Sequence, residues 1–296
     1  MKTLQLADLK PAERQNWLQH AIAPRPIAFA STLDKNGNVN LSPFSFFNLF
    51  SANPPVIIFS PARRLRNNTL KHTLENIMEV PEVVLNICDY AMIQQMSLSS
   101  CEYPKGVDEF IKAGFTKVPA SIISPPMVKE AKVNLECRVL EVKSLGTEGG
   151  GGQLIIAEVI CMHIHENILN NEGTMIDQRK LHHIARLGGD WYCVVNESNL
   201  FQVPKPNVQL AIGVDTLPVS IRNSNILTGN NLGQLANVHE MPHIDAGYED
   251  EVLKNIIQYD AVNPEEMERQ IHIHAKNLLG DGKVQEAWQV LLSIGE

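Results

Sequence analysis

Alternating apolar and small polar positions predict β-strands over most of the first two thirds of the chain. Residues 27–33 alternate in this way and run into the sequence DKNG at 34–37, which is typical of a hairpin turn because Asn-Gly tolerates positive φ. Apolar runs at 54–60 and 81–88 fit buried strands. Two longer alternating runs, 132–144 and 153–165, predict a strand pair, and we expect the glycine-rich segment between them to be a flexible hairpin tip.

Helical spacing is limited to short inserts in this β-rich part. A first helix is predicted at 11–22, and its expected buried residues are Trp17, Leu18 and Ile22. Another helix is predicted near residue 70, and its expected inner face is Leu70, Leu74, Ile77 and Met78. The sequence therefore predicts a mainly β fold with helical inserts for residues 1–199.

The character of the sequence changes at about residue 200. An Asn- and Gly-rich stretch at 221–235 predicts an irregular loop, and a helix is predicted at 248–260. Asn263 and Pro264 are typical of a helix start, and a final helix is expected to reach about Ile294. We therefore expect an α-helical C-terminal extension at 200–296, an irregular loop followed by helices.

Composition and charge exclude several classes of protein. The chain of 296 residues has a formal net charge of -8, which argues against a general nucleic-acid-binding protein and against binding to anionic membranes. The N-terminus lacks an apolar signal segment, and no apolar run approaches the roughly 18 to 20 residues of a membrane span. The five cysteines are scattered without C-x-x-C spacing, which favours a reducing compartment. We expect a cytoplasmic protein.

The heptapeptide SPFSFFN at 42–48 is the first candidate binding segment. Its three phenylalanines offer flat apolar faces, and Ser42, Ser45 and Asn48 offer hydrogen-bonding groups beside them. A planar heteroaromatic ligand with a polar edge would suit such a site. The alternative is that Phe44, Phe46 and Phe47 only pack into the end of a barrel.

The segment PARRLRNNTLKHT at 61–73 is the second candidate. It places three arginines and a lysine among amides and hydroxyls, directly before a predicted helix. Cations, hydroxyls and the free N–H groups of a helix start favour a phosphate. The alternative is a solvated basic loop whose Thr or Asn caps the helix.

The sequence offers little support for a metal site or for a catalytic nucleophile. His163 and His165 share one face of a predicted strand with Cys161, but there is no H-E-x-x-H motif and no carboxylate at a ligand spacing. A G-x-S-x-G motif is also absent. We therefore expect no metal site and assign no catalytic nucleophile.

Several of these segments together resemble one family. RPIAFAST, SPFSFFN and NPPVIIFSPARRLRNNTLKHT, followed by GVDEFIKAGF, NLECRVLEV and AEVICMHIH, resemble the flavin reductase-like family in order from Pro24 to Tyr192. These proteins are FMN-binding split β-barrels related to flavoredoxin. The resemblance implies a split-barrel FMN-binding domain. It also implies that the chain forms a homodimer, with FMN near the subunit interface.

The resemblance also implies a division of the binding residues. Those implied to line the isoalloxazine ring are Ser45, Phe46, Phe47 and Asn48, with Ser31 and Thr32 close by. Those implied to hold the ribityl phosphate are Ser60, Arg64, Asn68, Thr69 and Lys71. The chain departs from many relatives at His72, where they carry an aspartate between the lysine and the threonine.

The activity implied is that of an NAD(P)H:flavin oxidoreductase, in which NADH or NADPH passes hydride to flavin N5. No side chain need act as an acid or base in that reaction, so the catalytic residues stay open. His163 is a candidate for lining the nicotinamide side, and the alternative is a hydrogen-bonded structural histidine. Two other functions remain: a flavoredoxin-like FMN electron carrier that is reduced by a protein partner, and a structural or interaction protein without flavin.

Overall fold

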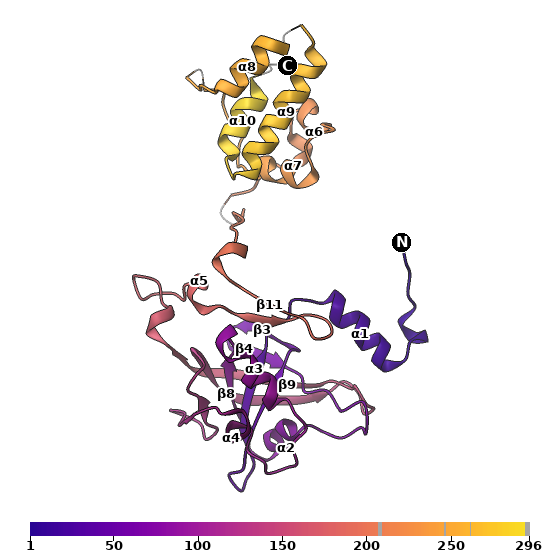
Figure 1. Cartoon of the computed structure of the whole chain (residues 1–296), viewed down its shortest axis with the longest axis vertical. Helices are drawn as coiled ribbons and strands as arrows, with labels where there is room; N and C mark the ends of the chain where they lie inside the picture. The colour runs from indigo at the N-terminus through magenta and orange to yellow at the C-terminus, as the bar shows by residue number, and fades with distance from the viewer. Residues whose placement is uncertain (207–208, 246, 261, 294–296) are drawn as a thin grey trace. The chain divides into compact units, whose positions relative to one another are not determined.

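The chain forms two compact units, Met1–Phe201 and Gln202–Glu296, in a computed structural model (Figure 1). The structure describes residues 1–206, 209–245, 247–260 and 262–293. Each unit has its own buried apolar cluster, so each is described by itself.

The first unit is built on a seven-stranded sheet in which every neighbouring pair is antiparallel. The strand order is β2-β1-β5-β8-β9-β4-β3. The strands are β1 (Ala28–Leu33), β2 (Val39–Phe44), β3 (Phe47–Ala52), β4 (Pro55–Phe59), β5 (Glu82–Ile87), β8 (Val133–Ser144) and β9 (Gln153–Ile164). The predicted hairpin turn is confirmed, because β1 pairs with β2 and Gly37 adopts a φ of 83°.

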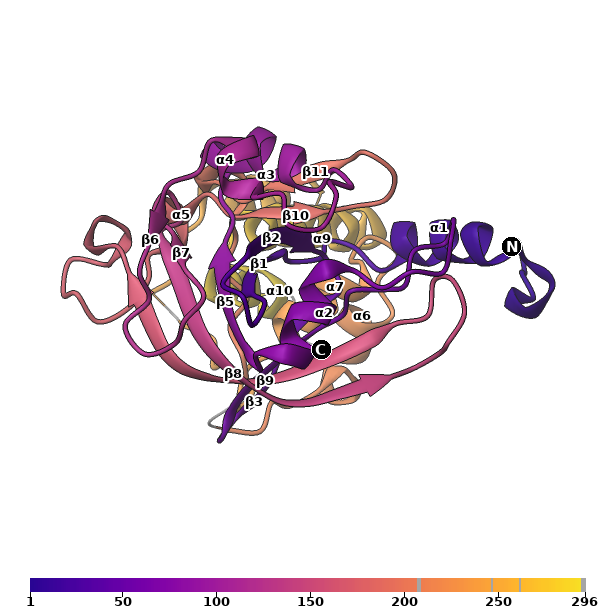
Figure 2. The same ribbon diagram turned by 90° about the horizontal axis from the view of Figure 1, so that it is seen from below.

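The chain order of the strands requires the sheet to curl. β2 and β3 lie at opposite edges of the sheet, yet only Ser45 and Phe46 separate them in the sequence. Three residue steps span at most about 11 Å, so the two edges must come together. Register shifts in the long pair β8–β9 provide the bends, and both strands curve along one side of the molecule in Figure 2. The sheet is therefore a split barrel, with Ser45 and Phe46 at the seam between its edges.

Short elements decorate this barrel. They are α2 (His72–Glu79), α3 (Ile93–Ser99), α4 (Glu109–Ala113), α5 (Gln178–Leu181) and the strand pairs β6 (Lys117–Val118) with β7 (Met127–Val128) and β10 (Ile184–Arg186) with β11 (Tyr192–Val194). Single 3-10 turns lie at Leu6–Asp8, Tyr90–Met92, Glu166–Ile168 and Glu197–Asn199. Gly114 ends α4 with a φ of 73°, where a residue with a Cβ would be strained.

Strand β1 is buried on both faces, which explains why its residues are apolar or carry only a small hydroxyl group. Phe29 enters one cluster, where its ring meets Phe115 edge-on at 5.3 Å. Ala28 and Ala30 face a second cluster that includes Phe59. The alternation in the sequence therefore distributes this strand between two apolar cores.

Two expectations about helix faces are wrong. Helix α1 (Pro11–Ala21) forms as predicted, but Trp17, Leu18 and Ile22 are exposed rather than buried. Met78 is also exposed, because the inner face of α2 is Thr73, Leu74, Asn76 and Ile77. In both cases the apolar residue lies on a face that the rest of this unit does not cover.

The second unit is helical, as the sequence predicts. Its helices are α6 (Val219–Arg222), α7 (Gly229–Ala236), α8 (Glu251–Asp260), α9 (Pro264–Gly280) and α10 (Val284–Leu292), with a 3-10 turn at Val214–Thr216. They surround a cluster centred on Trp288, whose indole N–H donates to the carbonyl of Leu235. Among the helices in the described ranges, none is long and apolar enough to span a bilayer.

The irregular loop expected at 221–235 is wrong in its second half. Thr228 and Asn231 exchange backbone and side-chain hydrogen bonds, and this capping box starts α7. The Asn and Gly residues that suggested a loop are thus partly the capping residues of a helix. The predicted end of the final helix, near Ile294, lies outside the described residues.

Candidate functional site

A cavity of about 460 Å³ opens at the seam of the barrel. Its walls come from the β2–β3 link, the loop after β4, the start of α2 and the segment after α3. The lining residues are Gln15, Gln19, Ser42, Pro43, Phe44, Ser45, Phe46, Ser60, Ala62, Arg63, Arg64, Leu65, Arg66, Lys71, Ser100 and Glu102. The two segments singled out in the sequence, 42–48 and 61–73, therefore meet at one cavity.

The loop between β4 and α2 is shaped by Asn68. This residue adopts a left-handed φ of 55°, which asparagine tolerates better than most residues. Arg63 holds it in place by donating to its side-chain and backbone oxygens, both at 2.6 Å. The Asn68 amide in turn donates to the carbonyl of Thr147 at 3.0 Å. Asn68 thus fixes the loop conformation and does not line the cavity, while Arg63 lines the cavity with two of its nitrogens committed to Asn68.

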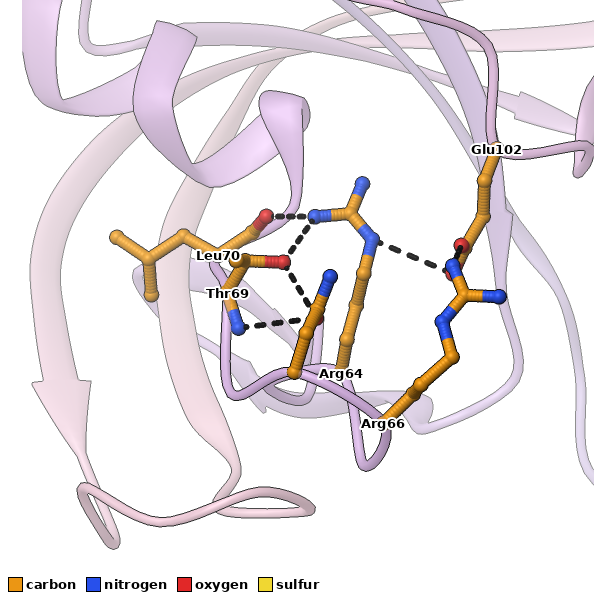
Figure 3. Close-up of polar contacts among 6 residues, drawn as sticks. Arg64, Arg66, Thr69, Leu70 and Glu102 are labelled. Carbon is orange, nitrogen blue, oxygen red and sulfur yellow. Dashed lines mark hydrogen bonds and ion pairs between the residues drawn. The ribbon is translucent and has the colours of Figure 1, made fainter.

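Arg64 is held over the cavity by contacts on two sides (Figure 3). Its Nη1 donates to Thr69 Oγ1 at 3.0 Å and to the carbonyl of Leu70. Its Nε lies 3.3 Å from a carboxylate oxygen of Glu102. Thr69 Oγ1 donates to Asn67 Oδ1 at 2.9 Å, so this hydroxyl is used within the loop.

Within the described part of the chain, Lys71 is a cation of the cavity without a partner. It is half-buried, and among the residues that the structure describes its ammonium group makes no hydrogen bond or ion pair. Burial and the neighbouring Arg64 lower the pKa of Lys71, and Glu102 offsets this only in part. A half-buried charge without a partner is unfavourable, so Lys71 is suited to an anion that enters the cavity.

Ser60 supplies a hydroxyl that is already oriented. Its Oγ accepts the backbone N–H of Gln153 at 3.0 Å, and its side chain lines the cavity at the end of β4. Because the oxygen accepts from one side, the hydroxyl hydrogen remains available to a ligand. Gln153 is therefore a supporting residue that the sequence did not indicate.

The three phenylalanines of the heptapeptide have different roles. Phe44 and Phe47 belong to the apolar core, where Phe44 lies 5.7 Å from the ring of Phe59. Phe46 instead stands exposed at the cavity wall, beside Ser45. Packing is therefore confirmed for Phe44 and Phe47, while Phe46 is the phenylalanine that is left accessible to a ligand.

Several residues implied by the resemblance do not line the cavity. Ser31 and Thr32 are fully buried in β1, and Thr32 Oγ1 accepts the side-chain amide of Asn76 at 3.2 Å. The Asn48 side chain accepts the N–H of Leu49 at 2.8 Å on the exposed strand β3. The structure brings five of the implied residues together at the cavity: Ser45, Phe46, Ser60, Arg64 and Lys71.

The glycine-rich tip between β8 and β9 contacts the cationic loop at 61–71 and is not a free hairpin end. Gly150 donates its N–H to Arg63, and Arg63 donates its own to Gly151, at 3.0 and 2.9 Å. A Cβ on Gly149 would approach the carbonyl oxygens of Arg64 and Leu65 closely. Glycine is needed here because the tip lies directly on the cationic loop.

This tip and α1 enclose a second hollow of about 720 Å³. Its lining includes Leu18, Ile22, Arg25 and the backbone of 146–151. Gln15, Gln19 and Phe46 line both hollows, so a ligand in one would adjoin a ligand in the other.

Replacing Gly151 with alanine is expected to disturb the cationic loop. A Cβ at this position would lie 2.5 Å from the carbonyl oxygen of Gly146, so the tip must shift. We expect a loss of stability of about 1–3 kcal/mol together with weaker binding of any anion in the cavity. Urea unfolding and ligand titration measure both. Gly233→Ala is the matched control, because a Cβ there meets nothing within 4 Å, and equal effects of the two substitutions would contradict the account.

His163 is part of a buried polar cluster outside the cavity. Its Nε2 lies 2.6 Å from Glu136, whose fully buried carboxylate also accepts three backbone N–H groups, those of residues 121–123. Cys161 Sγ lies 3.6 Å from the same nitrogen, so the three groups have the spacing of a metal-ligand set. The carboxylate is already saturated by N–H donors, which favours an anchor for the loop at 121–123. The structure therefore does not bring His163 to the cavity.

The sequence missed the residues that come from distant segments. Glu102, Ser100, Gln15 and Gln19 lie far along the chain from 61–73, and none belongs to a recognisable motif. Only the negative charge of Glu102 and the polarity of the other three side chains relate them to the cationic loop. The glycine tip was visible in the sequence, but its contact with the loop depends on the pairing of β4 with β9.

Comparison with known proteins identifies the first unit. The flavin reductase like domain matches residues 20–185. The uncharacterized protein BH2278 of Halalkalibacterium halodurans is 33% identical over 202 residues, which cover 68% of this chain and 94% of that protein.

Solved structures agree with this match. Nitrilotriacetate monooxygenase component B from Bacillus cereus has a TM-score of 0.64 at 29% identity, covering 69% of this chain and 98% of that one. A Shewanella frigidimarina protein assigned as a flavin reductase with a split barrel domain has a TM-score of 0.59 at 25% identity, covering 69% and 99%. The remaining third of this chain has no counterpart in these two proteins, which are matched almost completely. By its sequence and by its split barrel, this chain belongs to the flavin reductase-like family.

Proposed function

We propose that this chain binds FMN in the seam cavity and is an FMN-dependent oxidoreductase, a flavin reductase that uses NADH or NADPH. The observation that carries the proposal is Lys71, a half-buried cation without a partner among the described residues. It lies beside Arg64 and the oriented hydroxyl of Ser60, a donor set suited to a phosphate. The family membership and the FMN chemistry of flavin reductases support the same assignment.

The residues of the cavity fit the two ends of FMN. Lys71, Arg64 and Ser60 would hold the phosphate, while Phe46 and Ser45 would meet the ring from the seam. Bound FMN would supply a hydride acceptor at its N5. The contribution of the chain itself is to bind and orient: Phe46 would contact the ring, and the glycine tip fixes the loop that carries the cations.

The second hollow supports a nicotinamide nucleotide as the electron donor. It adjoins the first at Phe46, and it offers the apolar side chains of Leu18 and Ile22. Its two arginines, Arg14 and Arg25, already donate to backbone carbonyls. The apolar surface suits a planar ring. Its position would bring such a ring beside whatever occupies the seam cavity.

Anaerobic reduction of the protein with bound FMN tests this function. We expect NADH or NADPH to bleach the visible flavin band rapidly, and the nucleotide that acts faster is the donor. Flavin that binds but is bleached by neither nucleotide would contradict the reductase assignment and favour the second candidate, a flavoredoxin-like carrier reduced by a protein. Failure of the full chain to bind FMN would overturn both.

We further propose that two copies of the chain associate. Leu49 and Phe50 are exposed on the edge strand β3, and Trp17 and Ile22 are exposed on or just after α1. Apolar residues of this size at a sheet edge are typical of an interface.

The five cysteines are all free, which supports a reducing compartment such as the cytoplasm.

A further inference from the structure

We propose that Glu102 is an internal counter-anion of the seam cavity, which competes with the ligand phosphate for Arg64 and stays paired with Arg66 alone when the phosphate binds. This inference rests on the proposed binding of FMN and concerns how tightly the site holds it. It assigns a role to a carboxylate that lines an otherwise cationic cavity.

The geometry puts Glu102 between two arginines. One carboxylate oxygen lies 3.3 Å from Arg64 Nε, and the other lies 2.5 Å from a terminal nitrogen of Arg66 (Figure 3). All three side chains line the cavity. A single carboxylate therefore joins the cationic loop to the segment that follows α3.

The remaining donors of Arg64 explain why this carboxylate competes with a phosphate. The Nη1 group is committed to Thr69 and to the carbonyl of Leu70. A bidentate grip on a phosphate would therefore use the edge formed by Nε and Nη2. The Glu102 carboxylate forms an ion pair beside Nε at 3.3 Å, so a phosphate at this edge would meet a like charge until the carboxylate withdraws.

Arg66 provides a place for the displaced carboxylate. Its side chain is 78% exposed, that of Glu102 is 42% exposed, and that of Arg64 is only 13% exposed. The exposed pair can therefore move together into solvent while the buried guanidinium stays over the cavity. Charge balance favours this exchange, because a phosphate carries up to about two negative charges and replaces a single one.

The consequence is a site that binds phosphate-bearing flavin less tightly than its cations alone would allow. Each FMN that binds must first break the contact between Glu102 and Arg64. Riboflavin has no phosphate and does not compete for Arg64, so Glu102 acts on the phosphate end alone. A weakened grip suits a protein from which flavin is released after reduction.

Titration of the full, flavin-free chain with FMN and with riboflavin tests the role of Glu102. Glu102→Gln keeps the shape of the side chain and removes its charge. We expect the dissociation constant for FMN to fall by about tenfold, from the lost ion pair and the lost repulsion between carboxylate and phosphate. The constant for riboflavin should stay the same. Quenching of flavin fluorescence reports both constants without any turnover.

Glu172→Gln is the matched control, because it removes the same charge at a residue that is exposed and does not line the cavity. Tighter FMN binding in both variants would show a general charge effect and overturn the proposal. Unchanged or weaker FMN binding in Glu102→Gln alone would also overturn it, because Glu102 would then only brace Arg64. If neither the wild-type chain nor the variant binds either flavin, the proposed function itself fails.

Arg66→Gln separates the pairing with Arg66 from simple competition. In the wild-type chain this substitution should weaken FMN binding, because the displaced carboxylate loses its cationic partner. In the Glu102→Gln background the effect should be smaller, since there is no carboxylate to receive. Equal effects in the two backgrounds would overturn the role of this pairing.

Discussion

Replacing Lys71 with methionine is expected to raise the dissociation constant for FMN about 100-fold. The ammonium group lines the cavity beside Arg64 and lacks a partner among the described residues, so its contact with a phosphate would be new on binding. A hydrogen bond to a charged group contributes about 1.5–3 kcal/mol, and about 2.7 kcal/mol corresponds to this factor. Riboflavin should bind the variant and the wild-type chain alike, which fluorescence titration would measure.

The same substitution should not destabilise the free protein. Burial and Arg64 lower the pKa of Lys71, which means that folding makes its charged form less favourable than in the unfolded chain. Methionine removes that charge at similar volume, so we expect unchanged or increased stability in urea unfolding. Lys35→Met is the control, because Lys35 is exposed and does not line the cavity. A variant that lost stability along with FMN affinity would show that Lys71 is structural.

The cationic loop was predictable because its chemistry is contiguous. Arg64 and Lys71 lie seven residues apart in one segment between a strand and a helix, so local sequence was enough to bring them together. The same signal overestimated Asn68 and Thr69, whose polar groups serve the loop itself. Local sequence shows which residue types are present, but the hydrogen bonds within a loop decide which of them remain free for a ligand.

The seam and its supporting residues were not predictable in the same way. Most of the strands were recognised one by one, but β3 was not, since residues 42–48 were interpreted as a binding segment. The closing of the barrel follows from β2 and β3 lying at opposite edges of the sheet. The pairing of β4 with β9 brings the glycine tip onto the cationic loop, and the segment after α3 brings Glu102 to Arg64. The exposure of Trp17 and Ile22 was missed for a related reason, because apolar periodicity shows a face and not what covers it.

Replacing Glu136 with glutamine is expected to destabilise the β-rich unit by about 3 kcal/mol, because it leaves buried N–H groups without an acceptor. The carboxylate is 0% exposed and accepts from the backbone of 121–123 and from His163. A glutamine side chain has one acceptor oxygen and one donor amide group. The amide nitrogen would therefore face backbone N–H groups that need an acceptor. Urea unfolding followed by circular dichroism would measure the loss.

Glu130→Gln is the control for this change. Glu130 also accepts a backbone N–H, that of Thr116, but it is exposed to solvent and can exchange that bond for water. We expect its substitution to cost less than about 1 kcal/mol. Similar losses for the two variants would contradict the view that the buried carboxylate anchors the 121–123 segment.

The dependence of protein stability on pH at acidic pH provides an independent test of the role of Glu136. Burial alone would raise the pKa of its carboxyl, but His163 and the three backbone N–H groups outweigh burial and hold the pKa below its ordinary value of 4.5. A carboxyl whose pKa is lowered on folding stabilises the protein fully above the unfolded value and loses this contribution as pH falls toward the folded value. The wild-type chain should therefore lose stability on acidification below about pH 4.5 more steeply than Glu136→Gln, which lacks the titrating group. Parallel curves for the two proteins in that range would mean that the carboxylate contributes nothing specific to the fold.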